Sequence, residues 1–461
     1  MRSLLAFAAL AAVSLASPAV AQKGAPHEAQ ARAIYEKIVS FRTAKGHGQV
    51  PAMANYLSDT LKAGGVAASD IAMLPLDETV AMLVRIPGRD SKKRPILFSG
   101  HMDIVDALPA DWERDPFTLV EEGGYFFGRG TGDNKAGIAA MASTILRLKA
   151  SGRAPARTLV FAFIGDEETG MGTTRLAAAH EWVKNAEYAI NTDAGGGGLD
   201  PAGKPLMYAV QGGEKTFASF KVTKRNPGGH SSRPREDNAI YELSEALLRL
   251  KGHRFRAMAN PLTRSYFANV GKMLPGAAGE AARRFAANPA DAEAAEIIRK
   301  SPDAGAIATT CVATMLSAGH AENALPQRAE AIVNCRIFPG VAVDSVKATL
   351  ASVMADPAIE IETMGSPLES PVSEPRPDVS AAIARSIHRR YPGIAITPYQ
   401  ESGGTDGLVY RSAGIPTWAT SGIFMKDSDM FFHGKNERIP VKAFYEALEH
   451  IHDLAVDLGG R

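Results

Sequence analysis

Apolar residues in this chain form two kinds of run. Short continuous runs predict strands that are buried on both faces, and they occupy residues 80–86, 96–98, 158–164 and 188–191. Longer stretches repeat their apolar positions at helical spacing, and these are residues 25–63, 135–150 and 175–184. Strands that alternate with helices predict an α/β fold, in which a mainly parallel sheet carries helices on both faces.

The order of elements changes from about residue 213 onward. The predicted order is strand, helix, strand, strand, helix, strand, at residues 216–223, 238–250, 306–316, 329–338, 343–354 and 359–363. This is the order of the ferredoxin-like fold. We therefore predict an inserted α+β domain, the lid, over residues 213–365, with a long Ala-rich helical insertion at 253–303. The first domain then consists of residues 22–212 and 366–461.

The N-terminus has the composition of a targeting segment. A basic Arg2 precedes an apolar run at residues 4–15, and Ala19-Val20-Ala21 provides a small-x-small cleavage site. This predicts a signal peptide at residues 1–21 and an exported protein, periplasmic or secreted. A buried N-terminal helix is the alternative. No later stretch is long and apolar enough to span a bilayer, so we do not expect a membrane-spanning protein.

Composition narrows the classes of partner. The chain has 461 residues, more than one hydrophobic core usually supports, which agrees with two domains. Lys and Arg number 51 against 50 Asp and Glu, so there is no basic surplus to predict nucleic-acid binding. The two cysteines, Cys311 and Cys335, lie in strand-like runs that could be neighbours. Whether they pair stays open at this point.

Polar residues follow the predicted buried strands where these strands end. His101 and Asp103 come after the strand at 96–98, Glu167 and Glu168 after that at 158–164, and Asp193 after that at 188–191. In open α/β sheets, ligands bind beyond the carboxyl ends of the strands, so these residues are expected to converge. His101 and Asp103 are two apart, and extended chain points both the same way, so the carboxylate can orient the imidazole.

Two more residues complete the predicted site. A glycine-rich loop at residues 128–133 delivers Asp133 just before a helix, and His433 follows two phenylalanines, in a setting we expect to be dry. Carboxylate oxygens mixed with imidazole, without cysteine, suit catalytic zinc, manganese or cobalt. The groups are too many for one ion, but two ions that share a carboxylate would use them all.

A general base is also needed near the metals. Glu167 beside Glu168 can divide the roles of base and ligand. The alternative is that the two acids only favour the positive end of a helix dipole. The chain has no G-x-S-x-G, so a serine nucleophile on an elbow has no support.

Taken in order, these motifs resemble the aminoacylase, carboxypeptidase G and dipeptidase family of dinuclear zinc amidohydrolases, over nearly the whole of residues 22–461. They are S-G-H-M-D (99–103), G-R-G-T-G-D-N-K-A-G (128–137), G-D-E-E-T-G (165–170), N-T-D-A-G (191–195), G-G-H-S-S (228–232), N-A-L-P (323–326), R-I-F-P-G (336–340), S-G-G-T-D-G (402–407) and F-F-H-G-K-N-E (431–437).

The resemblance implies a role for each matched residue of the metal centre. Asp133 would bridge two Zn²⁺ ions, for which Co²⁺ or Mn²⁺ could substitute. His101 and Asp193 would complete one site, and Glu168 and His433 the other. Asp103 would orient His101, and Glu167 would shuttle the proton.

The resemblance also implies substrate contacts and a dimer. His230 of the lid would reach into the partner subunit's site and polarise the scissile carbonyl, which implies a homodimer through the lid. Asn323 and Arg336 would hold the substrate, because the planar fork of arginine suits a carboxylate. The loop residues expected to line the substrate site are Gly403, Gly404 and Thr405.

Within the family, the chain looks most similar to the branch of carboxypeptidase S and the secreted N-acyl amino acid hydrolases. It departs from that branch at Ala194, where an acid is expected. From the family resemblance as a whole, we predict hydrolysis of the amide bond of small peptides, as in a dipeptidase or carboxypeptidase. The first alternative is an N-acyl amino acid amidohydrolase, and a more distant one is a non-catalytic binder of peptides or metal.

Overall fold

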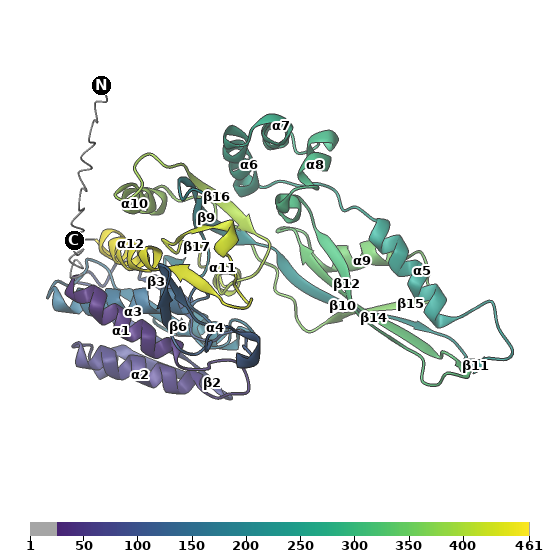
Figure 1. Ribbon diagram of the computed structural model, residues 1–461, viewed down its shortest axis with the longest axis horizontal. Helices are drawn as coiled ribbons and strands as arrows, with labels where there is room; N and C mark the ends of the chain where they lie inside the picture. Colours follow the sequence, from purple (N-terminus) through teal and green to yellow (C-terminus); the bar gives the residue numbers. More distant parts are fainter. Residues whose placement is uncertain (1–24, 461) are drawn as a thin grey trace, which may run out of the picture.

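The computed structural model describes residues 25–460, so the predicted signal peptide at 1–21 lies outside the described residues. A ten-stranded sheet dominates the larger lobe (Figure 1). Its strands are β1 (Ile71–Leu76), β2 (Thr79–Ile86), β3 (Ile96–His101), β6 (Leu159–Ile164), β7 (Tyr188–Asn191), β8 (Gly196–Leu199), β9 (Pro205–Glu214), β16 (Ile396–Glu401), β17 (Thr417–Ala419) and β18 (Phe424–Lys426). β3 pairs in parallel with β6 and β7, and β7 with β17, as predicted for the centre of the sheet.

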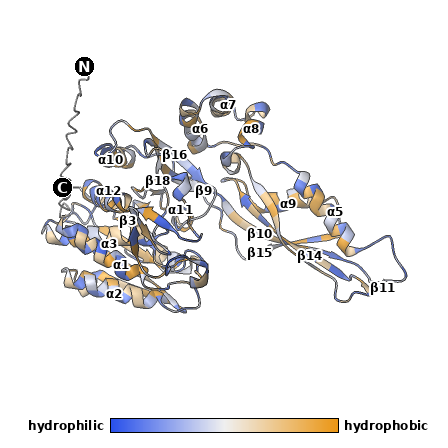
Figure 2. Cartoon of the chain, viewed as in Figure 1, coloured by the Kyte–Doolittle hydropathy of each residue, from blue (hydrophilic) through white to orange (hydrophobic). Residues whose placement is uncertain are grey.

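Helices cover both faces of this sheet. One face packs against α1 (Pro26–Val39), α2 (Val50–Ala63), α3 (Lys135–Ala150), α10 (Pro377–His388) and α12 (Val441–Gly459), and the other against α4 (Gly172–Ala179) and α11 (Gly407–Ser412). Successive residues of a strand face opposite sides, so Phe98 packs with the first group and Leu97 with the second. Figure 2 shows hydrophobic residues concentrated on the central strands.

Two helix predictions need correction. The helical stretch predicted at residues 25–63 is two helices, because Gly46 and Gly48 adopt φ of 84° and 59°, which an L side chain rarely does. The helix predicted at 175–184 begins earlier and ends at Ala179. His180 takes an extended backbone there, and its carbonyl accepts turn hydrogen bonds from the next residues.

The lid region has the predicted topology. β10 (Thr216–Arg225), β12 (Thr310–Ala318), β14 (Arg328–Ile337) and β15 (Ile359–Met364) form an antiparallel sheet in the order β12-β14-β10-β15. α5 (Ala239–Gly252) and α9 (Val343–Met354) pack on it, in a hydrophobic cluster separate from those of the large sheet. Cys311 and Cys335 face each other across β12 and β14 and form a disulfide.

The Ala-rich insertion is indeed helical and borders the large sheet. It comprises α6 (Pro261–Met273), α7 (Gly276–Ala287) and α8 (Ala292–Ile298), which share their own hydrophobic cluster. Asn260 Nδ2 donates to Gln400 Oε1 at 2.6 Å and Asn269 Nδ2 to Thr397 Oγ1 at 3.0 Å, so α6 is tied to β16 (Figure 1). The strand predicted from residue 306 starts only at Thr310, because residues 302–307 form a 3-10 turn.

Smaller elements complete the chain. β11 (Gly229–His230) pairs with β13 (Ala324–Leu325) at the far end of the lid. β4 (Val120–Glu122), β5 (Tyr125–Phe127) and β19 (Arg438–Pro440) form a three-stranded sheet beside α12. Among residues 25–460, no helix combines the length and apolar character needed to cross a bilayer.

Candidate metal centre

The candidate metal centre lies where three parallel strands end. β3 lies between β6 and β7, so the carboxyl ends of these strands share one edge of the sheet. His101 is the last residue of β3, Glu167 and Glu168 follow β6, and Asp193 follows β7. The fold thus places the polar residues after these strands together, as the sequence predicts.

One group of ligand atoms surrounds His101. Its imidazole is fully buried, and Nε2 lies 2.8 Å from Asp133 Oδ1 and 3.2 Å from Asp193 Oδ1. Its Nδ1 lies 3.0 Å from the Asp103 carbonyl oxygen. A proton on Nδ1 donated to that carbonyl leaves the Nε2 lone pair directed at the two carboxylates, as a metal-binding imidazole requires.

A second group surrounds His433. Its Nε2 lies 2.9 Å from Glu168 Oε1 and 3.0 Å from Asp133 Oδ2. Asp133 therefore turns one oxygen to each histidine. His433 has φ of 61°, a backbone conformation that is unusual for a residue with a side chain and that recurs at functional sites.

The expected dry setting of His433 is wrong for the single chain. Its side chain is 51% exposed, and Phe431 and Phe432 are themselves partly exposed, because the segment lies on the rim of a cavity. Hydrogen bonds to Asp133 and Glu168 raise the pKa of His433 to about 10. The imidazole thus lies beside two carboxylates that could bind the same metal ion as its nitrogen.

The donor set fits two divalent metal ions. Three groups of residues each have their possible ligand atoms within 4.8 Å of one another, namely His101–Asp133–Asp193, His101–Glu167–Glu168 and Asp133–Glu168–His433. Imidazole nitrogen with carboxylate oxygen suits zinc, manganese or cobalt. Of the residues in these groups, Asp133 alone turns a different oxygen to each histidine, Oδ1 to His101 and Oδ2 to His433, which is what a bridging ligand requires.

Asp103 links the two strand ends more directly than its spacing predicts. Its Oδ1 accepts the Glu167 N–H at 3.1 Å and its Oδ2 accepts the Glu168 N–H at 3.0 Å. Oδ1 also lies 3.5 Å from His101 Nδ1. The carboxylate therefore holds the backbone of Glu167 and Glu168 and stands close to His101.

Burial changes the acidity of the carboxylates at the site. Burial raises the pKa of Glu167 well above that of an exposed glutamate, and the neighbouring charges of Asp193 and Glu168 raise it further. Burial raises the pKa of Asp193 to about 8. A raised pKa moves the Glu167 carboxyl group toward the range in which it can both accept and donate a proton.

The centre opens into a cavity of about 590 Å³. The predicted substrate residues Gly403, Gly404 and Thr405 line it, beside the glycine-rich strand β8. Its apolar wall consists of Ala209, Ile423, Met425, Met430 and Phe432. Two further carboxylates that are not in the ligand groups, Glu401 and Asp427, also face it.

Three predicted substrate residues lie away from this cavity. His230 is exposed on β11 at the far end of the lid, and the Asn323 carbonyl accepts the Ser231 N–H beside it at 3.0 Å. Arg336 lies on β14 with its guanidinium over the Phe217 ring, 4.8 Å from the centroid. Within one chain, none of the three lines the metal cavity.

Glu437 and Arg129 occur in the motifs of the sequence analysis, but no role was predicted for them. Glu437 ends the F-F-H-G-K-N-E motif, is fully buried, and receives an ion pair from Arg129 of the glycine-rich loop at 2.6 Å. The sequence signal that could have found them is a basic residue in one ligand-bearing motif and an acidic residue in another. No spacing rule joins residues so far apart.

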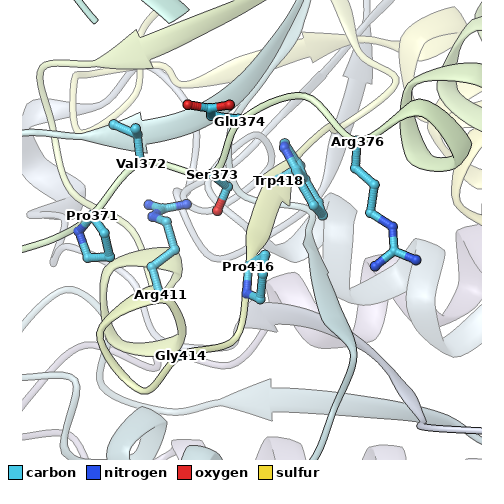
Figure 3. A pocket seen from close by; sticks show the side chains of 9 residues that line it. All are labelled: Pro371, Val372, Ser373, Glu374, Arg376, Arg411, Gly414, Pro416 and Trp418. Atoms are coloured by element: carbon cyan, nitrogen blue, oxygen red, sulfur yellow. The ribbon is translucent and has the colours of Figure 1, made fainter. Parts of the chain in front are cut away.

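A separate cavity of about 350 Å³ lies beside the return from the lid (Figure 3). Arg411 points toward Ser373 there, whereas Arg376 points away. The Arg411 guanidinium is already bonded to Glu214 and to the Thr417 carbonyl oxygen. In the part of the chain that the structure describes, no group of possible metal ligands lies in this cavity.

Comparison with known proteins agrees with this geometry. Residues 97–457 match the model of the peptidase family M20/M25/M40. The chain belongs to this family. As a member of the M20/M25/M40 peptidases it is a hydrolase of the metallopeptidase type, and its mainly parallel sheet with an inserted lid is the fold of these proteins.

The chain is 26% identical over 383 residues to a relative named "Probable carboxypeptidase S-like 2" from Dictyostelium discoideum. The match covers 80% of this chain and 72% of the relative. The chain is 27% identical to the Homo sapiens "N-fatty-acyl-amino acid synthase/hydrolase PM20D1", with 82% and 76% covered. The structure of an M20 family metallo-carboxypeptidase, Sso-CP2 from Sulfolobus solfataricus, superposes with a TM-score of 0.69 at 20% identity, covering 92% of this chain and 98% of the other.

Proposed function

We propose that this chain uses two divalent metal ions to hydrolyse the amide bond of a small peptide or an N-acyl amino acid. This proposal rests on the two ligand groups that share Asp133, with Glu167 beside them. Apart from the buried His101, these residues line one cavity. We propose zinc as the metal, with cobalt or manganese as substitutes, because the donors are imidazole and carboxylate only.

The protein's own residues divide the remaining work. His101, Asp193, Glu168, His433 and the shared Asp133 would hold the metals. When bound, such a pair of ions activates a water molecule and polarises a carbonyl group.

Glu167 is the proposed proton shuttle. It would accept a proton from the attacking water as the new C–O bond forms, and it would deliver that proton to the amine as the C–N bond breaks. Its raised pKa and its N–H bond to Asp103 support this role.

Two substrate classes are supported by different walls of the cavity. Glu401 and Asp427 could hold the free ammonium group of a dipeptide, which supports a dipeptidase activity. The apolar wall around Ile423, Met425 and Phe432 would instead accommodate an acyl chain, which supports an N-acyl amino acid hydrolase. The human relative, by its name an N-fatty-acyl-amino acid synthase/hydrolase, belongs to the second class.

A homodimer through the lid would complete the substrate site. His230 lies too far along the lid to line the cavity of its own chain, and we propose that it acts in the cavity of the partner, with Asn323 beside it. Arg336 would bind the substrate carboxylate when the lid closes. The edge strand β12 supports such a contact, because Met315 is 67% and Leu316 63% exposed on an edge with no neighbouring strand among the described residues.

We further propose that the protein is exported. The basic start, apolar run and Ala19-Val20-Ala21 site of the sequence support a signal peptide. The disulfide between Cys311 and Cys335 supports an oxidising compartment, since such bonds persist mainly outside the cytosol.

Amide hydrolysis by zinc-loaded protein, residues 22–461, tests the proposal. A panel of dipeptides, N-acetyl amino acids and long-chain N-acyl amino acids would be followed by mass spectrometry. Cleavage of free-amine dipeptides alone would assign a dipeptidase, and preference for acylated substrates an acylase. No cleavage of any substrate by protein with both metals bound would contradict the proposed function.

A further inference from the structure

Glu437 and Arg129 connect the two loops that carry Asp133 and His433. The loop of residues 128–133 follows β5, and the loop of residues 433–437 precedes β19, which pairs antiparallel with β5. The two loops therefore leave the same small sheet side by side, although they are about 300 residues apart in the chain. Each delivers one ligand of the Asp133–Glu168–His433 group.

The contacts of Glu437 reach the backbone beside Asp133. Its Oε1 accepts the Gly132 N–H at 2.8 Å and the Asp133 N–H at 3.3 Å. Its Oε2 accepts Arg129 Nη1 at 2.6 Å. One carboxylate thus accepts hydrogen bonds from the Arg129 side chain and from the backbone at the end of the same glycine-rich loop.

Arg129 carries the connection to the other loop. Its Nη2 donates to the Gly434 carbonyl oxygen at 3.1 Å, directly after His433. Its guanidinium also lies 5.3 Å from the centroid of the Trp112 ring. The side chains of Arg129 and Glu437 are 4% and 0% exposed, so the pair is shielded from water and salt.

We propose that Glu437 and Arg129 are positioning residues that set the geometry of the second metal site, the one formed by Asp133, Glu168 and His433. His433 is held in a left-handed conformation in an otherwise exposed segment, so its position depends on contacts made by the neighbouring backbone. The first site has firmer support, because His101 ends β3 and Asp193 lies two residues beyond the end of β7, at the centre of the large sheet. Loss of the pair would therefore weaken the second site more than the first, with which it shares only Asp133. This inference concerns metal binding and does not depend on which substrate is cleaved.

The test uses Glu437→Gln, which keeps the shape and one acceptor oxygen but removes the charge that Arg129 meets. Metal-free protein is titrated with Co²⁺, and both binding steps are followed by visible absorption and by calorimetry. We expect the affinity of the second metal site for Co²⁺ to fall 10- to 100-fold, the usual effect of removing a residue that supports a ligand, while the affinity of the first site falls clearly less. The cobalt spectrum of the second step should also change, because the coordination geometry shifts.

Glu449→Gln is the matched control. Glu449 forms an ion pair with Arg147 at 2.8 Å between α3 and α12, without contact to either ligand loop. It should bind both Co²⁺ ions as the native protein does.

Unchanged binding of both ions by Glu437→Gln would overturn the proposal. Equal weakening of both would overturn it too, because a general loss of structure does not distinguish the sites. If Glu437→Gln does not fold, Arg129→Lys replaces it, since lysine keeps the charge but lacks the fork that reaches both Glu437 and Gly434. Native binding of the second ion by Arg129→Lys would likewise refute the inference.

Discussion

Replacing Asp103 with asparagine tests how the strand ends are held together. Both oxygens of the carboxylate are occupied, one by the Glu167 N–H at 3.1 Å and one by the Glu168 N–H at 3.0 Å. Asparagine keeps one acceptor oxygen, but its NH₂ group would face the other N–H, and two donors cannot pair. The variant therefore loses one charge-assisted hydrogen bond and leaves a buried N–H unsatisfied.

The expected loss of activity follows from the one hydrogen bond that is removed. A hydrogen bond to a charged group contributes about 1.5 to 3 kcal/mol. If about 2 kcal/mol is lost from the positioning of Glu167 and Glu168, kcat/KM should fall about 30-fold. The assay is steady-state hydrolysis of the best substrate of the panel, with the metal content of each sample measured in parallel.

Asp166→Asn is the matched control for Asp103→Asn. Asp166 accepts the Gly172 N–H at 2.7 Å and the Thr173 N–H at 2.9 Å at the start of α4, so asparagine removes a similar bond there. It should lower stability without a comparable fall in kcat/KM. Activity of Asp103→Asn within about twofold of native, at full metal content, would refute the positioning argument.

Three further predictions concern stability and assembly. His450 is fully buried and its pKa is lowered to about 3, so between pH 6.5 and 3 the unfolded chain binds a proton that the folded chain excludes. Lowering the pH from 7 to 5 should therefore reduce the free energy of unfolding by about 2 kcal/mol. The urea midpoint of His450→Gln should lose this pH dependence, and a midpoint that depends on pH as in the native protein would contradict the prediction. The Cys311–Cys335 disulfide spans 24 residues, so replacing both cysteines with serine should lower the unfolding free energy by about 3 kcal/mol, and no measurable change would count against it. If His230 acts across subunits, His230→Ala and Glu167→Gln are each inactive alone, but a mixed dimer of the two has one intact site. A random mixture, in which half of the dimers are mixed, should therefore regain about a quarter of native activity. No recovery in verified mixed dimers would exclude the shared site.

Most residues that converge at the candidate metal centre could be selected from the sequence because their signals are local. A buried apolar run followed by His101 or Asp193 identifies both a strand and the place where it ends, and parallel pairing then brings such ends together. The lid topology followed for the same reason, since the order of its strands and helices nearly determines how its sheet is built.

Features that depend on tertiary contacts were missed. No periodicity shows that α6 is tied to β16 by Asn260 and Asn269, or that Arg129 meets Glu437 across about 300 residues. The two phenylalanines before His433 indicated burial, but the rim of the cavity leaves them partly exposed. In each case the deciding partner comes from a distant part of the chain.

Glu167→Gln, measured for metal content and turnover in the same samples, tests the central claim most directly. Glutamine keeps the size of the side chain but cannot accept the proton of the attacking water. We expect two metal ions per chain, as in the native protein, and a loss of kcat of at least about 100-fold. Native turnover with both ions bound would contradict the assignment of Glu167 as the proton shuttle.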